Sequence, residues 1–119
     1  MSGDEFQDGG GAAAARQHYH GHRERLRERL LERGGASLAD HEVLEFLLFG
    51  AQPRGDTKPL AKALLARFGS LARVLTADPA ALAQVKGMGT ASIAALKIVT
   101  QAAERLAREE AMAGDVISS

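Results

Sequence analysis

The sequence contains no cysteine, so it cannot form a disulfide scaffold, a thiolate zinc site or a cysteine nucleophile. It also has no long hydrophobic run, since every apolar stretch is far shorter than the roughly 20 residues of a membrane span. The first residues, MSGDEF, lack the positive and apolar regions of a secretory signal. These absences exclude a secreted disulfide-rich protein and a membrane protein, and we expect a cytoplasmic protein with no membrane partner.

An excess of charge of either sign is absent as well. Fifteen Lys and Arg residues balance fifteen Asp and Glu residues in a chain of 119. No global field therefore draws the chain to nucleic acid or to an anionic membrane, and such binding must come from a local patch. The length suits one domain whose core needs neither a metal nor a disulfide.

The apolar residues that are present recur at helical spacing, and no segment shows the β-branched alternation of a strand. We therefore predict an all-α fold, a small bundle of five or six helices. Six helices are expected. They cover about 22–33, about 40–49, a third that is capped by Asp56 or Thr57 and ended by Gly69, a short one from the Ser70 cap to Leu75, one from 79 to Gln84 or Val85, and about 90–109. Leu31 in the first and Leu106 in the last are expected to face the core.

Two segments are predicted to be flexible tails. Residues 1–21 hold runs of glycine and alanine, and residues 110–119 contain Gly114 with little to pack after it. The folded domain is thus expected over 22–109.

The strongest motif is LAQVKGMGTASIAAL at 82–96, in which two predicted helices flank Gly-Met-Gly and aliphatic residues stand at fixed offsets. This spacing is typical of a helix-hairpin-helix, here expected over 79–109. Met88 would fill the gap between the helices, while backbone N–H groups at the start of the last helix would bind one phosphate oxygen. The candidate DNA-phosphate-binding residues are Lys86, Gly87, Met88, Gly89, Thr90, Ala91, Ser92 and Lys97.

The alternative interpretation is that Gly-Met-Gly only connects two helices tightly or packs against protein. One residue also departs from the usual hairpin pattern. Ile93 stands where a small residue normally lets the helices approach, so its branched side chain is expected to separate them.

Other polar clusters favour structural explanations. His18, His20 and His22 lie close together, but no carboxylate completes a metal site, and we expect neither a metal nor a cofactor. The five arginines and three glutamates of 23–33 favour a solvated, self-paired face over a nucleic-acid stripe. Ser37-Leu-Ala-Asp40 resembles a capping box, and Asp40, Glu42 and Glu45 suit a capping turn and a polar face. No catalytic triad or nucleotide loop is present.

Four stretches occur in an order that resembles the N-terminal region of the RadC family, historically called DNA repair proteins. They are RLRERLLERG (25–34), LEFLLFG (44–50), DTKPLAKALLARFGSL (56–71) and VKGMG (85–89). In that family, a helix-hairpin-helix region precedes a JAB/MPN metal domain that resembles zinc isopeptidases. The metal-domain motif, a Glu followed by His-x-His-Pro-Ser-Gly and a later Asp, does not occur in this sequence.

The resemblance therefore implies a truncated protein or an isolated domain without the family's hydrolase site. Our leading hypothesis is a non-catalytic module that contacts the DNA backbone without sequence preference, and weakly because it has a single motif. The rival function is a protein-interaction or positioning domain for a protein partner or for the family's own C-terminal metal domain. An enzyme is the third possibility, and no residue pattern supports it.

Overall fold

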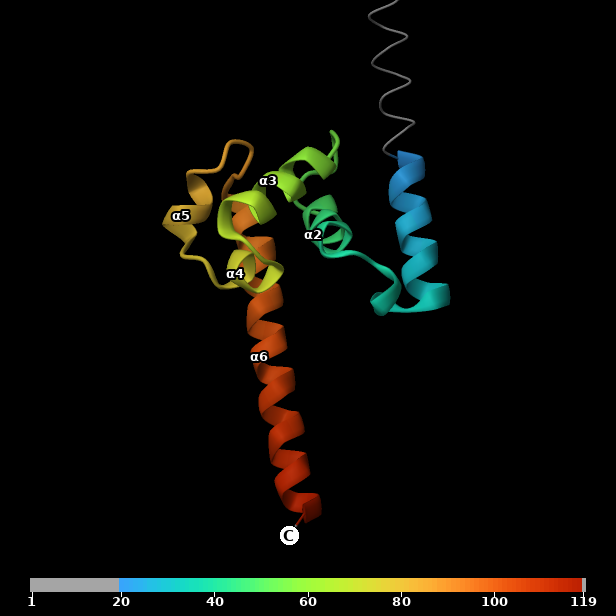
Figure 1. The fold of residues 1–119 in the computed structure, drawn as a ribbon, viewed down its shortest axis with the longest axis vertical. Coiled ribbons are helices and arrows are strands. Elements are labelled where there is room, and N and C mark those ends of the chain that lie inside the picture. The colour runs from blue at the N-terminus through green and yellow to red at the C-terminus, as the bar shows by residue number, and fades with distance from the viewer. Residues whose placement is uncertain (1–19, 119) are drawn as a thin grey trace, which may run out of the picture. The chain divides into compact units, whose positions relative to one another are not determined.

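The computed structural model describes the backbone of residues 20–118 and the side chains of residues 20–114. This part of the chain forms six α-helices and one short 3-10 helix, with no strand, which confirms the predicted all-α fold (Figure 1). The predicted tail over 1–19 lies outside the described residues. Residues 20 and 21, also assigned to that tail, are helical. The chain divides into two compact units, up to Lys62 and from Ala63, and each is described by itself.

The first unit is built on a helix over 20–33, here called the N-terminal helix, and on α2 (Asp40–Phe49). Between them lies the 3-10 helix η1 (Gly35–Ser37). Leu26 of the N-terminal helix and Leu44 and Leu48 of α2 are buried. Helical spacing places Leu44 and Leu48 on one face of α2, so the apolar pattern of the sequence directly explains this part of the core.

Three details of this unit differ from the predictions. Leu31 is 78% exposed, because the inward face of its helix is the one that carries Leu26. Ala39 caps α2 in place of the predicted Ser37 box, and its N–H donates to Glu42 Oε1 over 2.9 Å. Glu45 does not lie on a polar surface but is completely buried.

Arg23 is a polar member of the first unit's interior, since only 8% of it is exposed. Its guanidinium donates to the carbonyl oxygens of Gln52 (2.7 Å), Pro53 (2.9 Å) and Gly55 (3.0 Å), and it lies 4.6 Å from the centre of the Phe49 ring. Buried charges are tolerated when hydrogen bonds satisfy them. Arg23 therefore fixes the loop that follows α2 to the N-terminal helix.

The boundary between the units falls within α3 (Lys58–Phe68), and the second unit continues with α4 (Leu71–Thr76), α5 (Pro79–Ala83) and α6 (Thr90–Ser118). Ser70 caps α4 as predicted, by accepting a hydrogen bond from the N–H of Arg73 over 3.2 Å. Helices α4 and α5 both pack against α6 (Figure 1). The buried apolar residues of this unit are Leu64, Val74, Leu82, Met88 and Leu96.

Helix α6 is longer than predicted. It continues past Glu109 and through Gly114 to Ser118, because a single glycine costs a helix only about 1 kcal/mol and the residues before it favour helix. Leu106, which was expected in the core, is 57% exposed. It lies in the stretch 102–114, in which every residue is exposed. Within residues 20–118, no helix is long and apolar enough to cross a membrane.

Candidate functional site

The candidate site is the turn that joins α5 to α6. Asp78 and Pro79 start α5 as the sequence predicts, and the helix ends at Ala83. Two backbone hydrogen bonds follow. The N–H of Val85 donates to the carbonyl oxygen of Leu82 (3.1 Å), and the N–H of Met88 donates to that of Val85 (3.0 Å). These bonds turn the chain sharply and carry it to the first residue of α6.

Met88 is 8% exposed, which confirms the prediction that its side chain fills the interior beside the turn. The apolar residue between the two glycines thus holds the turn against the buried side chains of the second unit. Its N–H donates to the carbonyl oxygen of Val85 within the turn. Met88 therefore contributes a buried side chain and no free hydrogen-bond donor.

The two glycines have different roles. Gly87 has a φ of +98°, a conformation that other residues adopt only with strain, so the turn requires glycine there. Gly89 has no such φ, and a Cβ placed on it would meet no atom within 4 Å. The fold of the described chain therefore accepts alanine at 89, and the open space beside Gly89 leaves its backbone accessible.

The exposed donors lie at the start of α6. Gly89, Thr90 and Ala91 are exposed, and their amides donate no hydrogen bond within the described residues. The first amides of a helix have no partner within it, and the helix dipole adds positive potential at this end. Lys86, also exposed, precedes the turn and adds a full positive charge. Together these groups suit a phosphate oxygen.

Besides Met88, three of the predicted phosphate ligands have interactions of their own. Ser92 is 2% exposed and already has an interaction partner, as does Gly87. The ammonium of Lys97 donates to the carbonyl oxygens of Leu75 (3.1 Å) and Ala77, at the C-terminal end of α4. Lys97 therefore stabilises α4 on α6 rather than presenting its charge to solvent. The accessible part of the predicted site is Lys86, Gly89, Thr90 and Ala91.

The histidine-rich segment does not assemble a metal centre in the described structure. His20 is exposed, His22 contacts Glu45, and His18 lies outside the described residues. Residues 20–118 contain no group of three or more His, Asp or Glu side chains placed to hold a metal ion.

The fold and the turn define a small all-helical domain that presents a glycine turn at the start of its longest helix. The model of one protein family, UPF0758 N-terminal, matches residues 19–94. The chain belongs to the UPF0758 family, which is the RadC family that the sequence resembles.

Two relatives give the extent of the similarity. A UPF0758 protein of Ruegeria pomeroyi is 53% identical over 98 residues, and one of Rhodobacter capsulatus is 51% identical over 94 residues. These alignments cover 82% and 79% of this chain but only 44% of each relative, so the chain spans less than half of their length. No solved structure matches the chain.

Proposed function

We propose that the chain is a non-catalytic module that binds the phosphate backbone of DNA without reading the base sequence. The α5–α6 turn acts as a helix-hairpin-helix, in which Gly89, Thr90 and Ala91 donate amides and Lys86 supplies charge. Phosphate contacts position a protein on DNA and carry no sequence information. The historical description of the RadC family as DNA repair proteins agrees with this function.

The observation that carries the proposal is the open space beside Gly89. A glycine that the fold does not need, next to unpaired helix amides, allows a phosphate to approach the backbone closely. A turn that served only to connect two helices would need glycine at 87 alone. The half-buried Ile93 donates its N–H to Gly89 O over 3.0 Å, so α6 starts regularly despite this branched side chain.

An NMR titration with short single- and double-stranded DNA, at low and moderate salt, tests the proposal. The largest amide shifts are expected between Lys86 and Ser92 with either DNA, and they should weaken as salt rises because phosphate contacts release counterions. Shifts confined to other segments would place binding elsewhere and refute the turn as the site.

A second candidate function, protein interaction, is favoured by a different observation. Ile98, Leu106 and Met112 of α6 are 66%, 57% and 62% exposed. Exposed apolar side chains of this size suit contact with another protein or with a further domain. Unchanged amide shifts with DNA, together with a complex formed through these three residues, would favour this function.

A further inference from the structure

The C-terminal part of α6 carries an exposed apolar face. Every residue from 102 to 114 is exposed, and Figure 1 shows this part of the helix extending beyond α4 and α5. Leu96, which is buried, and Ile98, which is 66% exposed, are two residues apart and therefore lie on opposite sides of the helix. Ile98 thus marks the side of α6 that faces away from the core of the second unit.

The large apolar residues of this part of α6 gather on that side. At 3.6 residues per turn, Ile98, Leu106 and Met112 fall within an arc of about 120° around the helix. The other residues of the same arc are Ala102, Arg105, Glu109 and Ala113. We call these seven residues the α6 seam.

The seam follows the spacing of a coiled coil. Positions 98, 102, 105, 109 and 112 are separated by alternating intervals of four and three residues, which is the heptad pattern of helices that pack along their length. Most of the stability of a protein helix comes from packing its apolar face, and no described residue covers this one. A second helix packed along the seam would bury it.

Two residues of opposite charge lie at the middle of the seam. Arg105 donates from Nε to Gln101 Oε1 over 2.8 Å, and neither Arg105 nor Glu109 has an ion pair among the described side chains. In a parallel pair of α6 helices, each of the two would face its own copy, and the like charges would repel. In an antiparallel pair, a two-fold axis beside residue 107 places Arg105 of each copy opposite Glu109 of the other.

The same axis also matches the apolar positions of the seam. It places Ala102 of one copy opposite Met112 of the other, so a small side chain meets a large one in two symmetric layers. A shift by one heptad would instead place Glu109 against Ile98 in one direction or against Met112 in the other, and its charge would be covered without a partner. The charges therefore select both the orientation and the register.

The charged residues beside the seam do not oppose this pairing. Glu104, Arg108 and Glu110 are exposed and lie outside the arc. Arg108 is the nearest of them and approaches its own copy across the axis, but Glu104 precedes it by one turn on the same helix and offsets its charge. The electrostatic preference between orientations is therefore determined by Arg105 and Glu109.

We propose that two copies of this chain associate through the α6 seam as an antiparallel helix pair, in which Arg105 and Glu109 form two symmetric ion pairs between the copies. The inference goes beyond DNA binding by the α5–α6 turn and does not depend on it. It names a second copy of this chain as the partner in the second candidate function. One helix face is a smaller interface than a stable dimer has, so the association is weak and reversible.

Sedimentation equilibrium of the whole chain, from about 10 µM to about 1 mM, measures this association. The wild type should change from monomer to dimer as its concentration rises. E109R should raise the dissociation constant about tenfold, because both ion pairs become contacts between like charges. The matched control E110R makes the same charge change outside the seam and should keep the constant within about twofold of the wild type. R105E/E109R restores opposite charges across the axis and should recover the affinity.

Disulfide formation tests the orientation, since the chain has no cysteine of its own. A mixture of A102C and M112C should form mixed disulfides on oxidation, because the two positions share a layer of the antiparallel pair. A102C alone should stay uncross-linked, whereas a parallel pair would join it to its own copy. The control is A103C mixed with M112C, in which the first position lies outside the seam and should not cross-link.

The outcomes also separate this inference from DNA binding. A monomer at every concentration would overturn it, and the seam would then be left to another protein or to the remaining length of the longer relatives. A dimer that E109R leaves intact, or that A102C alone cross-links, would overturn it as well. A monomer that binds DNA through the turn would refute the seam and leave the proposed function unaffected, while a dimer that binds no DNA would support the seam and refute the turn.

Discussion

His22 Nε2 lies 3.1 Å from Oε1 of Glu45, a carboxylate that is completely buried. The other oxygen of Glu45 has no hydrogen bond in the described structure and lies 4.0 Å from His41 Nε2. Two imidazoles from different helices therefore surround one enclosed acidic group. This arrangement links the N-terminal helix to α2 through a buried polar contact.

Replacing His22 with alanine should lower the free energy of unfolding by about 1–3 kcal/mol, because Glu45 would lose the one side-chain hydrogen bond that it makes within the described residues while remaining buried. Urea unfolding followed by circular dichroism measures this loss. The control is His20→Ala, which changes an exposed histidine of the same helix and should leave the stability unchanged. Equal stability of the two variants would show that the Glu45 contact contributes nothing.

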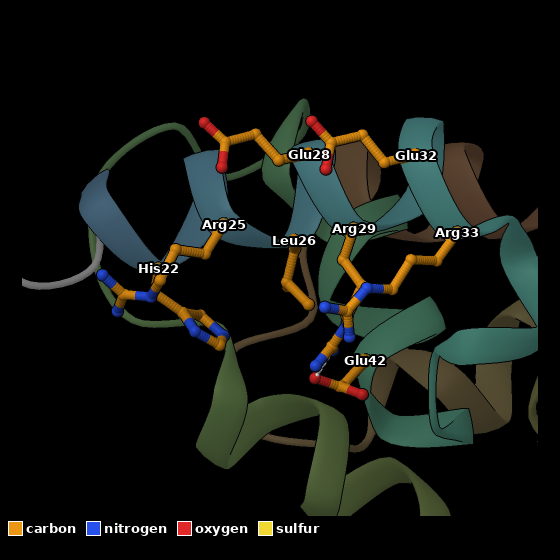
Figure 2. Close-up of a pocket in the computed structure, with 8 residues that line it drawn as sticks. All are labelled: His22, Arg25, Leu26, Glu28, Arg29, Glu32, Arg33 and Glu42. Atoms are coloured by element: carbon orange, nitrogen blue, oxygen red, sulfur yellow. Dashed lines mark hydrogen bonds and ion pairs between the residues drawn. The ribbon is translucent and has the colours of Figure 1, made fainter.

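Burial alone would raise the pKa of Glu42, but the hydrogen bonds from the Ala39 N–H and the Arg29 guanidinium outweigh burial and lower this pKa. Figure 2 shows the contact between Arg29 and Glu42. The lowered pKa predicts a pH dependence of stability. A carboxyl whose pKa is lower in the folded than in the unfolded chain, where it is near 4.5, stabilises the fold above that pH. This contribution is lost as the pH falls through the folded-state pKa. Glu42→Gln should therefore be less stable than the wild type at pH 7, and the difference should shrink on acidification.

Urea unfolding of both proteins between pH 7 and pH 3 measures this difference. Glu28→Gln is the matched control, since Glu28 is exposed and has no ion pair in the described chain. A difference that stays constant or grows toward pH 3 would contradict the role assigned to Glu42.

Substitutions of the two lysines should affect different properties, stability for Lys97 and DNA affinity for Lys86. Lys97→Met removes the hydrogen bonds to Leu75 and Ala77 and should cost about 1–3 kcal/mol of stability. Lys86→Met changes an exposed side chain and should leave stability within about 0.5 kcal/mol of the wild type, but weaken binding to every DNA sequence alike. Melting curves and salt-dependent DNA affinities test both claims. A stable Lys97→Met protein with weakened DNA binding would return Lys97 to the phosphate site.

The proposal that the chain is non-catalytic predicts that it folds without metal. Purified protein should keep its helical circular dichroism and melting temperature in EDTA. It should also cleave no peptide or isopeptide substrate when zinc is supplied, because a zinc hydrolase needs ligands and an acid–base group held in fixed geometry. Loss of folding on chelation, or turnover that His20→Ala abolishes, would show that this proposal is wrong.

Local signals in the sequence predicted the helices well. Asp40–Phe49 is the helix expected over 40–49, and the Ser70 cap and the Asp78-Pro79 start are where the sequence indicates. These features depend on residues close together in the chain, so short-range patterns determine them. The burial of Met88 was likewise predictable, because an apolar side chain between two turn glycines would otherwise be exposed to water.

Long-range partners could not be predicted. The burial of Glu45, the bonds of Arg23 to the loop after α2 and the bonds of Lys97 to α4 all join residues that are distant in sequence. Composition assigns such charged residues to the surface, and only the packed fold supplies their partners.

The affinity of Gly89→Ala for DNA tests the central claim most directly. The added methyl group meets open space in the fold, so the melting temperature should stay at or slightly above that of the wild type. In the bound state the methyl group would stand between the phosphate and the amides of α6. Losing one such charge-assisted hydrogen bond costs about 1.5 kcal/mol, or about tenfold in affinity. A folded Gly89→Ala protein with tenfold weaker DNA binding is the predicted result, and one with wild-type affinity would contradict the account.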